Sequence, residues 1–458
     1  MWQELTERFE QQAPAAVMAH LTLERALPAS WIDEVFEQHR QRQYPRQLLF
    51  SSVVELMMLV ALGLRPSLHA AARKMGERLP VSLAALYAKV QRTEPQLLRA
   101  LVHGSAQRLL PLAQYLPQSQ SLSGWQLRVI DGNHLPASDK RLGPLRGHRG
   151  AVLPGHTVVV YDPDCQLVCD IVACEDAYQS ERTAAAVLIE RAQAGQVWLG
   201  DRHFCTQALL QGLAQREAAF IVREHARHPK LAGEGAWSVP VAADTGQVRE
   251  QRIALAQPLT GALPECRRIE IALDVPTEAG DAHIVLWSNL PAQVDATTIA
   301  ALYRKRWRIE GMFGRLEAAL SSEIKTLGHP RAALLGFAVA VLAYNVLALL
   351  ARLTEQAHRA RHPQLDVSTY HLALEVGYDY GTMLRLLTPE HWPRPPDELS
   401  CLMQRLLRLA ARLSPKQLAT AKHKNAKSSR ARGYVKGAIA RSHVSTARVL
   451  QQAAGQRP

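Results

Sequence analysis

Apolar and polar positions follow different patterns in successive parts of this chain of 458 residues. Over residues 1–120 apolar side chains recur at helical spacing, and the strongly apolar run 48–64 predicts a buried helix that ends near Gly63. From Trp125 onward the apolar runs are short and rich in Val and Ile, which is typical of strands. We predict strands at 126–131, 156–161, 166–174, 196–201 and 218–223, with helices at 179–194 and 206–215. This order predicts an α/β fold with a mixed five-stranded sheet flanked by helices.

Residues 224–295 interrupt this alternation. Gly, Pro and Thr separate further β-like runs at 238–242, 251–255, 267–273 and 283–287, so we expect a β-rich insertion. Helices are predicted again at 296–320 and 331–353. The second of these is apolar enough that a membrane-spanning helix is an alternative, but its Ala-rich composition, with Tyr344 and Asn345, favours a helix in the protein core.

Basic residues are concentrated at the C-terminal end. The chain has 54 Lys and Arg against 41 Asp and Glu, a formal net charge of +13. No acidic residue follows Glu398, whereas 13 Lys and Arg lie between Cys401 and the C-terminus, so residues 1–400 hold 41 residues of each sign. A basic tail of this kind commonly binds a polyanion such as nucleic acid, and a tail that only increases solubility is the alternative.

Three acidic residues are candidates for a shared site. Asp131 and Asp201 end the first and fourth predicted strands, and carboxylates at the ends of neighbouring strands can meet at one edge of a sheet. In the helix after the insertion, Tyr303, Arg306 and Glu310 are spaced by three and four residues, so they share one helical face. Carboxylates that are brought together repel one another unless a cation neutralises them, and oxygen ligands favour Mg²⁺ or Mn²⁺.

Each of these residues also has a simpler structural interpretation. An Asp at the end of a strand often caps a turn or a helix, and Glu310 could form a surface ion pair with Arg306. Asp170, in the middle of the third predicted strand, is an alternative metal ligand.

The order of these motifs resembles a known family. The segments VIDGNH around Asp131, WLGDRHF around Asp201, FIVR before the insertion and TIAALYRKRWRIEGMF after it look like the DDE transposases of bacterial insertion elements. The insertion-sequence-four group of that family has a signature of Tyr, two residues, Arg, three residues, Glu, six residues and Lys. Tyr303, Arg306 and Glu310 match its first three positions, but Glu317 stands where the final Lys is expected.

The resemblance implies a fold and a set of site residues. It implies an RNase H-like core in which Asp131, Asp201 and Glu310 are catalytic residues that bind Mg²⁺, with Mn²⁺ as a possible substitute. The residues that it implies or suggests as DNA contacts are Tyr303, Arg306, Arg223, Lys325 and Asn133, the last in place of the family's usual hydroxyl residue after the first Asp. The implied regions are a helical DNA-binding domain at 1–120, the core at 121–223 and 296–360, the β-rich insertion at 224–295 and a helical region with the basic tail at 361–458.

The function that this resemblance implies is cut-and-paste DNA transposition. The expected reaction is metal-dependent strand cleavage and strand transfer at the ends of an insertion element. The expected partners are double-stranded DNA, both the terminal inverted repeats and the target, and a second copy of the chain in a synaptic complex. We expect no membrane association and a location in the bacterial cytoplasm at the nucleoid. A transposase-derived DNA-binding protein without catalytic activity is the alternative.

Overall fold

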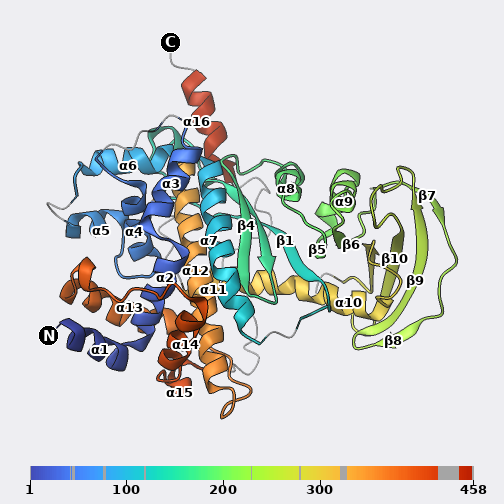
Figure 1. Cartoon of the computed structure of the whole chain (residues 1–458). Coiled ribbons are helices and arrows are strands. Elements are labelled where there is room, and N and C mark those ends of the chain that lie inside the picture. The colour runs from blue at the N-terminus through green and yellow to red at the C-terminus, as the bar shows by residue number, and fades with distance from the viewer. Residues whose placement is uncertain are drawn as a thin grey trace.

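The computed structural model describes residues 2–41, 43, 47–75, 79–117, 120–227, 229–277, 280–319, 327–420 and 443–455. Most helices gather at one end of the molecule, and a long sheet extends from them to the other end (Figure 1). The helices before the first strand are α1 (Trp2–Gln12), α2 (Pro14–Ala26), α3 (Ala29–His39), α4 (Phe50–Ala61), α5 (Leu68–Met75), α6 (Leu83–Arg92) and α7 (Pro95–Tyr115). Near the C-terminus are α12 (Pro330–His358), α13 (Thr369–Leu386), α14 (Leu399–Ala410), α15 (Pro415–Leu418) and α16 (Thr446–Gly455).

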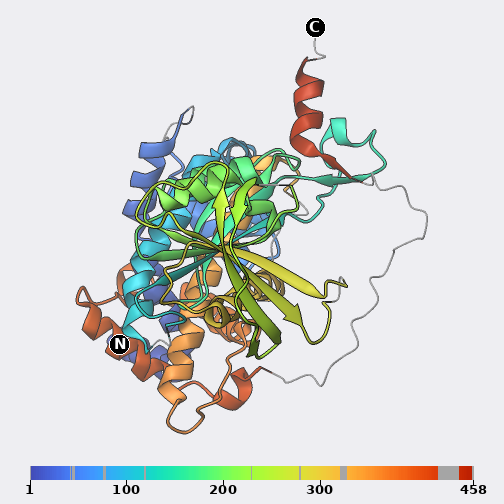
Figure 2. The ribbon, with the colours of Figure 1, turned by 90° about the vertical axis from the view of Figure 1, so that its right-hand side faces the viewer.

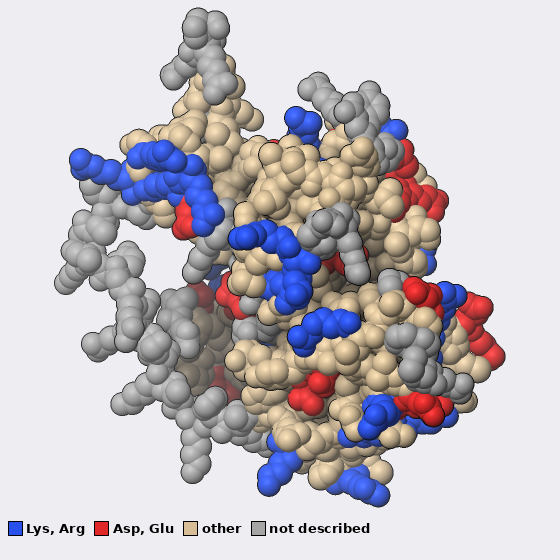
Figure 3. All heavy atoms as spheres, turned by 90° about the vertical axis from the view of Figure 1, so that its left-hand side faces the viewer, with Lys and Arg blue, Asp and Glu red and all other residues tan. Residues whose placement is uncertain are grey.

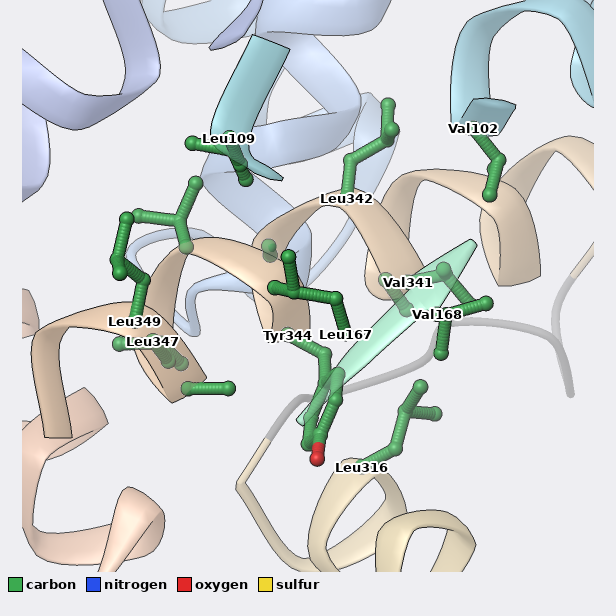
Figure 4. Close-up of a cluster of buried hydrophobic side chains, with 14 of the residues drawn as sticks. Val102, Leu109, Leu167, Val168, Leu316, Val341, Leu342, Tyr344, Leu347 and Leu349 are labelled. Atoms are coloured by element: carbon green, nitrogen blue, oxygen red, sulfur yellow. The ribbon is translucent and has the colours of Figure 1, made fainter. Parts of the chain in front are cut away.

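Helix α12 is the centre of the helical end. It contacts α2, α4, α6, α7 and α14, and 94% of its most apolar stretch of 18 residues is buried against the rest of the protein. Figure 4 shows Val341 and Leu342 of this helix among Leu109, Val168 and Leu316, which come from three other elements. The predicted core helix is therefore confirmed, and its burial accounts for an apolar composition that would also suit a membrane span.

All five predicted strands are present in one sheet. They are β1 (Gln126–His134), β3 (His156–Asp162), β4 (Leu167–Cys174), β5 (Gln196–Gly200) and β6 (Ala219–Arg223), and their order in space is β4-β3-β1-β5-β6. β1 pairs antiparallel with β3 and parallel with β5, and β5 pairs parallel with β6. The mixed sheet that the sequence predicts is thus confirmed in strand content and in its mixture of directions.

The prediction that the sheet ends after five strands is wrong. The insertion contributes β7 (Leu231–Glu234), β8 (Val241–Ala243), β9 (Gly246–Leu255), β10 (Cys266–Leu273) and β11 (His283–Ser288), which extend the same sheet to ten strands. β11 pairs antiparallel with β6, so the edge of the core that would otherwise expose backbone groups is covered. Buried Arg267 on β10 donates to the carbonyl oxygens of Leu290, Pro291 and Val294, which ties the insertion to the segment that leads into the next helix.

The two faces of the core sheet are covered by different helices. Alternate residues of a strand point to opposite faces, and Ile130 and Val158 pack with α8 (Glu181–Ile189) and α9 (Gln207–Ala214). Val129 and Val159 belong to the larger apolar core that includes α7 and α12. Asp131 is two residues after Val129, so its side chain lies on the α12 side of the sheet.

A second, smaller sheet was not predicted from the sequence. The three-residue strand β2 (Ala151–Leu153) pairs parallel with β12 (His443–Ser445), which immediately precedes α16. Figure 2 shows this pair and α16 projecting together beside the main sheet. Residues 421–442 of the basic tail lie outside the described residues, so the predicted role of the tail stays a prediction.

Asn345 joins the core helix to the edge of the sheet. Its side-chain oxygen accepts a hydrogen bond from the Val168 N–H at 2.8 Å, and its amide nitrogen donates to the Val168 carbonyl at 2.9 Å. Both residues are fully buried. The amide therefore satisfies two backbone groups of the edge strand β4 in the way that a neighbouring strand would.

We expect Asn345→Leu to destabilise the protein despite its greater hydrophobicity. Two buried backbone groups would lose their partners, which costs about 2–4 kcal/mol in the free energy of unfolding. A urea titration measures this loss, and Leu347→Met in the same buried helix is the control, with a cost below about 1.5 kcal/mol. A variant Asn345→Leu as stable as the wild type would contradict this role.

Candidate active site

The register of two parallel strands brings the two aspartates to the same level. Gln126 of β1 pairs with Gln196 of β5, and the pairing continues residue by residue to Val129 and Leu199. Two residues further along each strand are Asp131 and Asp201. The register therefore places Asp131 and Asp201 side by side toward the carboxyl ends of the two strands. Asp201 directly follows β5 as predicted, but Asp131 does not end its strand, because β1 continues to His134.

Asp201 also caps the short turn that follows it. Its Oδ1 accepts a hydrogen bond from the His203 N–H at 2.8 Å, at the start of the 3₁₀ turn Arg202–Phe204. The structural interpretation of this residue as a cap is thus correct. Because the cap uses only Oδ1, the second carboxylate oxygen of Asp201, Oδ2, remains for other contacts.

The sequence predicts a single helix over 296–320, the segment that contains Tyr303, Arg306 and Glu310. This prediction is wrong, because the segment is divided into two helices. Helix α10 (Ala296–Arg304) ends in a 3₁₀ turn at Lys305–Trp307, and α11 (Arg308–Ala319) follows. The tighter turn places Arg306 between the two helices, with only 8% of the residue exposed.

Arg306 connects two of the three predicted catalytic residues. Its Nη1 donates to Asp131 Oδ2 at 3.2 Å, and its Nη2 donates to Glu310 Oε1 at 3.4 Å. Its Nε is buried and has no hydrogen-bond partner among the residues that the structure describes. Asp131 and Glu310, which are far apart in the sequence, are therefore held around one guanidinium group.

The three carboxylates act on one another electrostatically. The pKa of Asp131 is raised from 3.8 to about 6. Burial is the largest cause, and the negative charges of Asp201 and Glu310 act in the same direction, whereas Arg306 and the Gly132 N–H oppose the rise. Asp201 and Glu310 therefore both lie close enough to Asp131 for their charges to affect its pKa.

The oxygen donors fit a hard divalent cation, but the present conformation is not ready to bind one. Across the described part of the chain, no three His, Cys, Asp or Glu side chains are close enough together to hold a metal ion. At Asp131 and Glu310 the Arg306 guanidinium supplies the positive charge instead. A cation could be bound by all three acids only after this side chain moves.

The other predicted site residues have mixed positions. Tyr303 is 5% exposed and hydrogen-bonds Arg306, and burial raises its pKa to about 12, so it supports Arg306 from within the core. Arg223 pairs with Asp281 of the insertion at 2.9 Å. Asn133 lies on the same face of β1 as Asp131. Lys325 lies outside the described residues.

Two further residues clarify the site. Asp170, the alternative ligand, is held by Arg99 through contacts of 2.9–3.1 Å and is 5% exposed, so its charge is already neutralised in a structural ion pair.

Trp307 is 59% exposed, and Arg306 Cζ lies 4.7 Å from the centre of its ring. The helical spacing alone did not indicate this stacking, because it depends on the 3₁₀ turn.

The geometry so far defines an α/β protein with an acidic site at the carboxyl ends of parallel strands. Comparison with known proteins agrees with the resemblance in the sequence. Residues 125–346 match the family model described as "Transposase DDE domain". A protein of Sinorhizobium fredii (strain NBRC 101917 / NGR234) with the name "Putative transposase y4zB" is 27% identical over 242 residues, which cover 50% of this chain and 61% of the relative. The chain is therefore similar to DDE transposases over its core sheet and insertion, and it spans less than two thirds of the length of this relative.

We expect Asp131→Asn to show a pH-dependent gain in stability. Because the pKa of Asp131 is about 6 in the folded state and near 3.8 in the unfolded state, the folded protein binds this proton more tightly. The wild type therefore loses up to about 3 kcal/mol of unfolding free energy as pH rises from 4 to 7. The variant avoids this loss, so its stability relative to the wild type should rise over the same range in metal-free buffer.

Asp281→Asn is the matched control for this measurement. In the wild type, a hydrogen bond and a charge interaction with Arg223 hold the pKa of Asp281 below 3.8, so the Asp281 carboxylate stays ionised from pH 4 to 7. The stability difference between this variant and the wild type should be constant over that range. The same constant difference for Asp131→Asn would show that Asp131 is not buried as described.

Proposed function

We propose that this protein is a metal-dependent transposase that cuts and joins DNA strands at the ends of an insertion element. The proposal rests mainly on one observation: Arg306 bonds both Asp131 and Glu310, and Asp201 lies at the end of the neighbouring strand, close enough for its charge to act on Asp131. The strand order β4-β3-β1-β5-β6 supports an RNase H-like core, and the family match covers this core and the insertion.

In this proposal the three acids hold Mg²⁺ or Mn²⁺ through carboxylate oxygens. Such ions activate a water or a 3′-hydroxyl group for attack on phosphorus and stabilise the departing oxygen. Arg306, once it leaves the carboxylates, is placed to bind a phosphate group of the DNA, since a planar guanidinium suits phosphate oxygens. Tyr303 positions Arg306 by a hydrogen bond from the protein core.

The partners in the proposal are double-stranded DNA and a second copy of the chain. The DNA comprises the terminal inverted repeats and the target, and the copies form a homodimer in a synaptic complex. Membership of the insertion-sequence-four group is supported by Tyr303, Arg306 and Glu310, and a cytoplasmic, nucleoid-associated location in a bacterium follows from it. The exposed Glu317 in place of the signature Lys changes a phosphate contact and leaves the three acids unaltered.

A DNA-binding protein that has lost catalysis is the second candidate. It is favoured by Glu317, whose charge would repel a phosphate that the expected Lys would attract. Binding and cleavage must therefore be measured separately.

We expect Asp201→Asn to reduce Mg²⁺-dependent nicking of DNA that carries the element ends by at least about 10²-fold, because a metal ligand is lost. Asn can still cap the turn at His203, so folding and DNA binding in a gel-shift assay should change little. Asp244→Asn, which removes an exposed carboxylate on the insertion, is the control and should nick at the wild-type rate. Equal nicking by Asp201→Asn and the wild type would remove Asp201 from the site, and no nicking by the wild type would favour the inactive candidate.

A second prediction concerns Arg306. Without DNA, Arg306→Gln should bind Mn²⁺ at least about tenfold more tightly than the wild type, because the ion no longer competes with a guanidinium close to the carboxylates. Titration followed by electron paramagnetic resonance of free Mn²⁺ measures this affinity. Arg304→Gln removes one positive charge two residues away, in a pair with exposed Asp244, and should have a much smaller effect. Weaker Mn²⁺ binding by Arg306→Gln would mean that Arg306 does not occupy the place of the ion.

A further inference from the structure

We propose that residues 139–149, which we call the basic lobe, form a separate contact surface for the phosphate backbone of double-stranded DNA. The inference rests on the proposed function and adds a second DNA surface beside the carboxylate site. Neither the spacing of the signature residues nor the family resemblance pointed to this segment.

The lobe is attached directly to the catalytic strand. β1 continues only three residues beyond Asp131, to His134, before the chain leaves the sheet, and it returns as β3 with His156 paired to His134. Since a strand rises by about 3.3 Å per residue, the departure point is about 10 Å along the strand from Asp131. A duplex whose cleaved bond lies at the carboxylates would therefore have backbone phosphates near the base of the lobe.

The charge of the lobe is strongly one-sided. Its sequence DKRLGPLRGHR contains four Lys and Arg and a single acid, Asp139. Asp139 pairs with Arg141 at 3.4 Å, but both side chains are more than half exposed, at 57% and 58%, so this pair is weak. Lys140 closes the loop by donating to the carbonyl oxygens of His148 and Arg149. The exposed Arg146 and Arg149 are left to face solvent with Arg141.

The C-terminal arm, residues 443–455, holds the lobe in place. Among the described residues, the apolar cluster at the lobe consists of Leu142 and Leu145 of the lobe and Val152 of β2, which is too little for the lobe to fold alone. β12 adds a strand to β2 at the end of the lobe, and α16 contacts its 3₁₀ turn Gly143–Leu145.

Contacts from the arm to the main body complete this attachment. The Arg448 Nε lies 2.7 Å from Asp176 Oδ2, and the Arg448 guanidinium stacks 5.2 Å from the centre of the Tyr178 ring. The Ala177 N–H donates to Ser445 Oγ at 3.0 Å, and the Tyr178 hydroxyl donates to the His443 carbonyl at 2.5 Å. The arm thereby ties the lobe to the main body and adds the half-exposed Arg448 beside it.

Figure 3 shows Lys and Arg side chains gathered at the base of the projecting part that carries α16, with a smaller acidic patch directly beside them. Arginine guanidinium groups bind phosphate oxygens through paired hydrogen bonds, and they predominate here over lysine. An acidic protein would satisfy the same charges. DNA is favoured because the lobe begins at the strand that carries Asp131, where the proposed reaction requires a phosphate chain.

The test is the salt dependence of DNA binding by the full chain with Arg146→Gln and Arg149→Gln combined. Each phosphate contact contributes about 0.9 to the slope of log affinity against log salt, so the slope should fall by about 1.8. The loss of affinity should be equal for DNA with element ends and for DNA of unrelated sequence, because phosphate contacts carry no base information. Fluorescence anisotropy with labelled duplexes at several NaCl concentrations measures both quantities.

The control is Arg252→Gln with Arg359→Gln, which makes the same charge change at exposed positions on β9 and just after α12. It should lower the slope much less, and both double variants should keep the wild-type melting temperature. An unchanged slope for the lobe variant would overturn the inference. Reduced binding of poly-glutamate by this variant, with unchanged binding of DNA, would also overturn it and would assign the surface to an acidic protein. A wild type that binds no duplex DNA would instead overturn the proposed function itself.

Discussion

The site depends on one buried guanidinium group between two carboxylates. Arg306 bonds Asp131 on the sheet and Glu310 at the start of the next helix, and a buried charge is stable only when it is paired. This interaction joins the turn between α10 and α11 to β1 of the sheet. The 3₁₀ turn at 305–307, the buried Tyr303 and the stacked Trp307 all serve to keep Arg306 at this position.

The same interaction links stability to function. Burial, together with the smaller effect of the Asp201 and Glu310 charges, raises the pKa of Asp131, so ionising this residue is costly and Arg306 offsets only part of the cost. A divalent cation would supply more positive charge than one guanidinium group. In the proposed function, the strained electrostatics of the site therefore favour binding of a metal ion, and the displaced Arg306 becomes available to DNA.

Local sequence patterns were sufficient for part of this structure. The five core strands, the buried helix α12 and the end of β5 before Asp201 follow from short-range periodicity and from the residues that interrupt it, and all were predicted. The predicted end of the first strand at Asp131 is wrong, because β1 continues to His134. The pairing of β11 with β6 and of β12 with β2 was not, because strands hundreds or tens of residues apart pair through tertiary contacts that no local pattern records. The break after Arg304 was missed for a similar reason: the ion pair with Asp131 favours a tighter turn than the helical pattern suggests. The lobe was overlooked because its charges, unlike those of the tail, lie within a formally neutral part of the chain.

The most direct test of the central claim is a crystal structure of the protein with Mn²⁺, using anomalous scattering to locate the ion. The account predicts an anomalous peak within about 2.5 Å of carboxylate oxygens from Asp131, Asp201 and Glu310, with Arg306 turned away from both of its present partners. Manganese bound elsewhere, with the guanidinium still between Asp131 and Glu310, would contradict it.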